Sequence, residues 1–183
     1  MVASTVYGFQ DQLSAIVGIL TTMDYTVINS QHGSVKVDPK LSNLDNCLNA
    51  VKECDFFLGI IRPYYGTGNI KDKNITFEEI KLAIKLGKPY WFLVHRDVVF
   101  ARQLLGKVKC KDGQGFDIEK NTIFDPRTID IYNTVVKDGE RVELRNGNWA
   151  QEFYRLDEAM TYIQAQFGDK EFVQELIETA NNG

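Results

Sequence analysis

The fold is decided by residues 76–94, which read TFEEIKLAIKLGKPYWFLV. Apolar residues recur there with the 3.6-residue period of a helix up to Gly87, and a continuous apolar run follows Pro89. The pattern predicts a helix over residues 76–87 and a buried strand over residues 90–94. A helix that leads directly into a buried strand is typical of a parallel sheet.

The same alternation of strand and helix extends back to the start of the chain. Strands are predicted at residues 2–4, 25–28 and 56–61, and helices at 9–20, after a cap at Ser42, and at 98–105. This alternation predicts an α/β fold, a flavodoxin-like doubly wound parallel sheet. Because such crossovers are right-handed, the expected strand order is 2-1-3-4, with space for a fifth strand.

The C-terminal part is less regular. The pattern predicts a long loop at 107–121, a helix at 127–136, a hairpin at 142–153 that turns at Asn146-Gly147, and helices at 156–167 and 171–180. We expect a single domain over residues 1–183, with a core at 1–107 and a helical and hairpin extension at 108–183.

Composition excludes several classes of function. The 183 residues carry a net charge of −4, which argues against nucleic-acid and membrane partners, and no stretch is long and apolar enough to span a bilayer. Three cysteines and two histidines form no metal-ligand spacing, so we expect no metal and no cofactor. Cys47 and Cys54 are predicted to be core thiols, and the chain is expected to be cytoplasmic.

The first predicted helix is unusual because residues 12–23 carry no charge. A helix on an open surface normally has a charged face. Two interpretations remain open, namely cover by the C-terminal helices and cover by a second subunit in a homo-oligomer.

A candidate ligand site follows from the predicted topology, because ligands of open parallel sheets bind beyond the carboxyl ends of the strands. The side chains expected there are a hydroxyl pair, aromatic rings, a guanidinium and a carboxylate: Ser4, Thr5, Tyr7, Arg62, Tyr64, Tyr65, Gly66 and Glu79. This combination suits a nucleotide or nucleoside.

Each of these residues also has a purely structural interpretation. Glu79 lies three residues after Thr76, in the spacing of a capping box, while Glu78 is expected to form an exposed pair with Lys81. Ser4 and Thr5 are suitable caps for the first helix. Tyr64 and Tyr65 are equally compatible with simple packing on the loop.

Several of these segments resemble a known family. Residues 2–5 (VAST), 10–13 (QDQL), 53–61 (ECDFFLGII), 65–66 (YG) and 76–89 look like the bacterial domain-of-unknown-function family DUF4062. That family is similar to Toll/interleukin-receptor (TIR) domains and to nucleoside 2-deoxyribosyltransferases, which share a flavodoxin-like fold. The resemblance implies a catalytic role for Glu79, because the transferases carry their catalytic glutamate eight residues before a Gly-Lys-Pro.

The resemblance and the expected site together suggest a function. We expect a TIR-like domain that cleaves or transfers at a ribosyl N-glycosidic bond, with NAD as the first candidate substrate, in bacterial anti-phage defence or signalling. A carboxylate beside the ribose can stabilise the oxocarbenium-like state of that reaction, and the start of a helix favours an ionised Glu79. The alternative is a non-catalytic nucleotide-sensing or protein-interaction module of the same fold.

Overall fold

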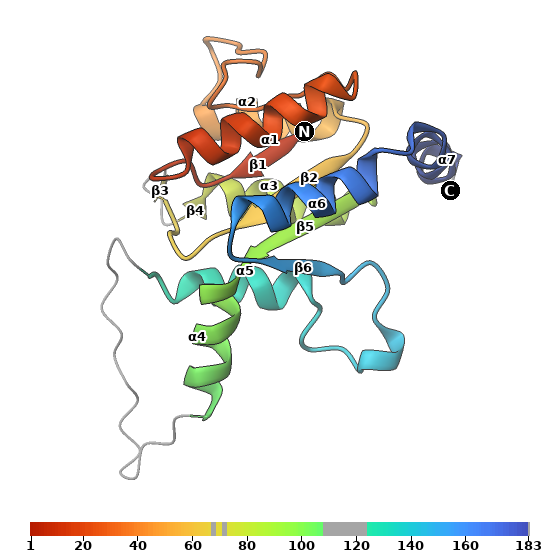
Figure 1. Ribbon diagram of the computed structural model, residues 1–183. Coiled ribbons are helices and arrows are strands. Elements are labelled where there is room, and N and C mark those ends of the chain that lie inside the picture. Colours follow the sequence, from red (N-terminus) through yellow and green to blue (C-terminus); the bar gives the residue numbers. More distant parts are fainter. Residues whose placement is uncertain (67–68, 71–72, 108–123, 183) are drawn as a thin grey trace.

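A four-stranded parallel sheet forms the centre of the computed structural model, which describes residues 1–66, 69–70, 73–107 and 124–182 (Figure 1). Its strands lie in the order β1 (Val2–Ser4), β2 (Phe57–Ile61), β5 (Tyr90–His95) and β6 (Ala150–Phe153). A second, two-stranded antiparallel sheet consists of β3 (Asn69–Ile70) and β4 (Lys73–Asn74).

Helices cover both faces of the central sheet. They are α1 (Gln10–Thr22), α2 (Asn43–Glu53), α3 (Ile75–Lys85), α4 (Arg96–Lys107), α5 (Arg127–Val135), α6 (Leu156–Phe167) and α7 (Lys170–Asn182), with a 3-10 turn, η1, at Val142–Leu144. One hydrophobic cluster joins the sheet to α2, α3, α4 and α5, and the other joins it to α1, α6 and α7. In Figure 1, α1 and α6 lie side by side over one face, and α2 and α3 lie behind the sheet.

The mixed α/β architecture is confirmed, but the predicted strand order 2-1-3-4 is wrong. Residues 25–28 run beside β1, as expected for the second strand, yet a single ladder bond joins the two, from Val2 N to Ile28 O (2.9 Å). Two backbone oxygens that a strand partner would otherwise bond accept from side chains instead. Asn29 Nδ2 donates to Val2 O (2.9 Å), and Ser34 Oγ donates to Val27 O (2.9 Å). The segment therefore forms no strand.

The predicted hairpin at 142–153 is also wrong. Only its second half is a strand, β6, which pairs parallel to β5, while η1 lies in its first half. The helices predicted at 127–136, 156–167 and 171–180 are confirmed within a few residues. The loop predicted at 107–121 lies outside the described residues apart from Lys107, which ends α4.

Helix α1, uncharged after Asp11, buries Leu13, Ile16 and Leu20 and packs alongside α6. Its outer residues Ser14 and Gly18 nevertheless remain exposed. Ser14 Oγ lies 3.2 Å from His32 Nε2, but the C-terminal helices do not cover this outer face, and a second subunit on it stays a prediction. Among the described residues, no helix is long and apolar enough to cross a membrane.

Gly59 of β2 lies at a tightly packed position of the sheet. The register aligns Ala3, Gly59, Phe92 and Ala150 in one row across all four strands. A Cβ at Gly59 would lie 2.7 Å from Cδ1 of Phe92, which is closer than packed carbon atoms approach. The ring of Phe92 therefore occupies the space that the missing side chain leaves.

We predict that Gly59→Ala lowers the free energy of unfolding by about 1–3 kcal/mol, because the new methyl group overpacks a buried sheet. The control is Gly18→Ala in α1, where a Cβ meets nothing within 4 Å. It should raise stability by about 0.5–1 kcal/mol through helix propensity. Urea unfolding of both variants tests this, and equal effects would contradict the packing argument.

Candidate functional site

A cavity of about 480 Å³ opens at the carboxyl ends of β1 and β2, between α2 and α3. Its polar lining comes from hydroxyl, amide, thiol and carboxyl groups of Ser4, Thr5, Tyr7, Ser30, Asn43, Asn46, Cys47, Tyr64, Asn74, Thr76 and Glu79. Its volume lies in the range of small-molecule sites. No cationic side chain is found among the described lining residues.

Glu79 is the acidic group of this cavity, and its side chain is almost completely enclosed, with the residue only 4% exposed. It lies in the second turn of α3, because the N-cap of this helix is Asn74, whose Oδ1 accepts from Phe77 N (2.9 Å). The capping-box interpretation, with Thr76 as the cap, is therefore wrong. The predicted pair of Glu78 with Lys81 is confirmed, but the Glu78 side chain is only 20% exposed.

Burial decides the charge of Glu79. It raises the pKa of this carboxyl to about 8, while a side-chain hydrogen bond with Cys47 acts weakly in the opposite direction. The pKa of the Cys47 thiol rises to about 12, mainly through burial and further through the nearby Glu79. Glu79 thus carries its proton at neutral pH, contrary to the expectation that the helix start keeps it ionised.

Five of the other predicted site residues line the same cavity, namely Ser4, Thr5, Tyr7, Tyr64 and Gly66. Thr5 Oγ1 donates to Tyr64 O (2.9 Å), which joins the loops that follow β1 and β2. Ser4 Oγ donates to Thr5 O (3.1 Å), and α1 begins after Phe9 without a side-chain cap. Ser4 and Thr5 therefore do not cap the first helix.

Arg62 and Tyr65 are not part of this cavity. Arg62 Nη1 donates to Thr5 O (3.0 Å) and Tyr7 O (2.9 Å), so its guanidinium supports the loop backbone from the opposite side. Burial lowers its pKa to about 10, which still leaves it charged at neutral pH. The buried ring of Tyr65 packs against the guanidinium of Arg127, 3.9 Å from its centroid.

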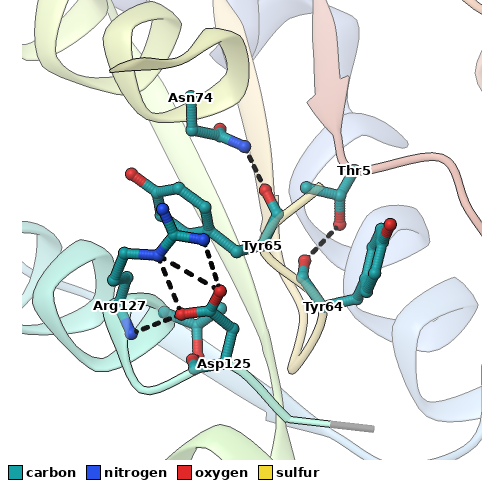
Figure 2. Close-up of polar contacts among 7 residues, drawn as sticks. Thr5, Tyr64, Tyr65, Asn74, Asp125 and Arg127 are labelled. Atoms are coloured by element: carbon teal, nitrogen blue, oxygen red, sulfur yellow. Dashed lines mark hydrogen bonds and ion pairs between the residues drawn. The ribbon is translucent and has the colours of Figure 1, made fainter. Parts of the chain in front are cut away.

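Figure 2 shows how the loop after β2 is held. Asn74 Nδ2 donates to Tyr65 O, and Asp125 N donates to Pro63 O (2.9 Å). The carboxylate of Asp125, a residue that is 4% exposed, accepts bidentate bonds from Arg127 Nε (3.0 Å) and Nη2 (2.6 Å). Residues distant in sequence thus fix the backbone that carries Tyr64 into the cavity.

Gly66 completes this arrangement. Its φ of +89° lies in the region that favours glycine, and a Cβ there would lie 3.2 Å from both Asn74 Nδ2 and Thr5 Cγ2. The close approach of these two side chains therefore requires a residue without a side chain.

Sequence reasoning missed six polar lining residues, Ser30, Asn43, Asn46, Cys47, Asn74 and Thr76. Burial of Cys47 and Cys54 was predicted and is confirmed, but the position of Cys47 beside Glu79 was not foreseen. A polar residue next to the inner stripe of a helix, such as Asn46, was the available signal. Among the described residues, no group of histidine, cysteine and acidic side chains could hold a metal ion.

Comparison with known proteins adds the following. A family model described as "Domain of unknown function (DUF4062)" matches residues 1–140. This segment contains the entire lining of the cavity, whereas β6, α6 and α7 lie beyond it. No curated protein and no solved structure matches the chain.

We predict that Glu79→Gln stabilises the protein increasingly as pH rises from 5 to 8. The pKa of Glu79 in the folded state lies above its ordinary value of 4.5, so the folded state holds a proton that the unfolded state has lost, and the stability of the wild type falls as pH rises through this window. The difference in the free energy of unfolding between Glu79→Gln and the wild type should grow by at most about 1.4 kcal/mol per pH unit. Urea unfolding at each pH measures it, with Glu78→Gln as control; a constant gap would contradict the burial argument.

We predict that Asp125→Ala loosens the loop after β2. Loss of the buried carboxylate removes one ion-pair partner of Arg127 and should lower the free energy of opening this loop by about 1–3 kcal/mol, discounted because Arg127 is partly exposed. Hydrogen exchange should accelerate at the amides of residues 64–66 and remain unchanged in α6. Unchanged exchange at 64–66 in a destabilised variant would show that this pair stabilises the fold without holding the loop.

Proposed function

This chain belongs to the DUF4062 family, and we propose that it is a TIR-like nucleotide-processing domain that cleaves or transfers at a ribosyl N-glycosidic bond. NAD is the first candidate substrate. The proposal rests on the resemblance of this family to TIR domains and nucleoside 2-deoxyribosyltransferases. The resemblance to TIR domains is also the reason for proposing a role in bacterial anti-phage defence or signalling.

One observation carries the proposal: a buried carboxyl group, Glu79, lies in the wall of a cavity of about 480 Å³ at the carboxyl edge of a parallel sheet. The hydroxyl and amide groups of Ser4, Asn43 and Thr76 line the same cavity and are suitable partners for ribose hydroxyls. Apolar surface from Val35, among others, completes the lining. Such a mixture is typical of sites for a nucleoside.

The chemistry needs one negative charge near the ribose. In hydrolysis, the bond between C1′ and the base nitrogen breaks, the base leaves with the electron pair, and water adds to C1′ and loses a proton. Positive charge develops on the ribose, and an ionised Glu79 would stabilise it or form a transient bond with C1′. Oxidised NAD is suited to this carboxyl because its nicotinamide ring is cationic, and a cation beside Glu79 lowers the pKa of this group.

The second candidate is a non-catalytic module that binds a nucleotide-derived ligand in the same cavity. The observation that favours it is the protonated state of Glu79 at neutral pH, since a neutral carboxyl can donate a hydrogen bond to a ligand but cannot stabilise a cation as strongly. Under this alternative, ligand binding would survive without turnover.

We predict that the purified protein releases nicotinamide from NAD and that Glu79→Gln reduces the rate at least about 100-fold, because the variant keeps the shape of the side chain and cannot ionise. In the wild type, kcat/KM should rise with pH through about 8, where the free enzyme loses the proton of Glu79. Chromatography with mass detection identifies the products.

The control for this experiment is Glu78→Gln, which changes a neighbouring carboxylate that pairs with Lys81 at the surface. If Glu79→Gln cleaves NAD as fast as the wild type, Glu79 has no role in the reaction. Binding of NAD without turnover in the wild type would favour the sensing module, and absence of both would refute the choice of NAD.

A further inference from the structure

A second cavity, of about 500 Å³, lies at the same edge of the sheet. It is bounded by Arg62 after β2, by His95 at the end of β5, and by Phe153 and Tyr154 at the end of β6. All these positions are carboxyl ends of parallel strands, where ligands of such sheets bind. The mechanism proposed for Glu79 makes no use of this cavity.

The two cavities share a wall made by Tyr7 and Tyr64, both of which line each of them. The two rings pack against each other with centroids 5.0 Å apart and an interplanar angle of 35°. Tyr7 is 63% exposed, so the pair forms a ridge at the surface between the cavities. A ligand with two ring systems could extend across this ridge.

The ridge is held in place from both sides. Arg62 donates to the carbonyl oxygens of Thr5 and Tyr7, and Thr5 Oγ1 donates to Tyr64 O. The guanidinium of Arg62 also packs on the ring of Phe9, 4.4 Å from its centroid. Both tyrosines therefore lie on backbone whose position does not depend on a ligand.

The second cavity contains hydrogen-bonding groups suited to an aromatic base. Asp97 N donates to His95 Nδ1 (3.3 Å), and Asp97 Oδ2 lies 3.4 Å from the same nitrogen. With Nδ1 as the acceptor of the backbone N–H, a neutral His95 carries its proton on Nε2, which has no hydrogen-bond partner among the described residues. Burial lowers the pKa of His95, and the nearby Arg62 and Arg96 lower it further, whereas Asp97 raises it. The net lowering of the pKa favours the neutral ring. A hydrogen-bond donor thus lies close to the carboxylate of Asp97, an acceptor.

Aromatic surface lies next to this polar pair. The ring of His95 packs against Tyr154, with centroids 5.6 Å apart, and against Phe153, at 5.4 Å. Tyr154 is 56% exposed, and the guanidinium of Arg96 lies over its ring, 5.4 Å from the centroid. A base can stack on the part of the ring that Arg96 leaves open. Adenine presents an amino donor beside a ring-nitrogen acceptor, which is the complement of Asp97 and His95.

We propose that this second cavity binds the adenine nucleotide half of a dinucleotide whose other half lies beside Glu79, with Tyr7 and Tyr64 between the two halves. The dinucleotide assignment rests on the proposed function, whereas binding of the adenine half can be tested without turnover. Because Phe153 and Tyr154 lie beyond residues 1–140, this subsite includes residues outside the segment that matches the family.

The first experiment measures binding of AMP to the full chain by calorimetry and NMR. We expect saturable binding that weakens roughly tenfold or more in His95→Ala and in Tyr154→Ala, through loss of a base contact. Glu79→Gln and the control Trp149→Ala, an exposed residue that lines neither cavity, should leave it unchanged. Tyr154→Ala alters an exposed side chain, so it keeps the test valid if His95→Ala folds poorly.

The second experiment compares NAD with nicotinamide mononucleotide, which lacks the adenine half. His95→Ala should lower kcat/KM for NAD and leave kcat/KM for the mononucleotide unchanged. Absent AMP binding, binding that neither variant weakens, or binding that Glu79→Gln abolishes would overturn the second subsite. AMP binding at His95 without any cleavage of NAD would instead contradict the proposed cleavage of NAD and leave the adenine subsite standing.

Discussion

The hydrogen bonds from Arg62 to Thr5 O and Tyr7 O are the contacts on which the arrangement of this edge depends. Strand β1 ends at Ser4, so the carbonyl groups beyond it have no strand partner and need another donor. Arg62 supplies that donor from the end of β2 and is itself stabilised by the ring of Phe9. The charged side chain of Arg62 therefore holds the loop backbone in place, and the cavity beside Glu79 has no cation among its described lining residues.

The parts of the fold that could be predicted from the sequence are those whose hydrophobic pattern is strong. The continuous run at 56–61 and the periodic stretch at 76–86 determine β2 and α3, because both bury apolar side chains at the spacing of their element. Residues 25–28 have a strand-like pattern but no ladder, since the side chains of Asn29 and Ser34 satisfy the backbone there. Such local competition by side chains is not visible in a hydrophobic pattern.

The site was predictable in location and only partly in detail. The rule that ligands bind at the carboxyl edge correctly brought Ser4, Thr5 and Glu79 to one cavity, because topology alone determines where strand ends meet. Side-chain direction does not follow from topology, which is why Arg62 and Tyr65 point elsewhere. The start of α3 was misplaced because Asn74 and Thr76 are both good caps, and only the backbone geometry at Asn74 decides between them.

The side chains that replace a strand beside β1 also have a consequence for behaviour in a crowded solution. An exposed edge of a sheet pairs readily with strands of other molecules and promotes aggregation. Here the N–H and C=O of Val2 on that edge are both occupied, by Ile28 O and by Asn29 Nδ2. The segment at 25–29 thus covers the edge of the sheet at β1, and it protects the protein from edge-to-edge association without the length of a full strand.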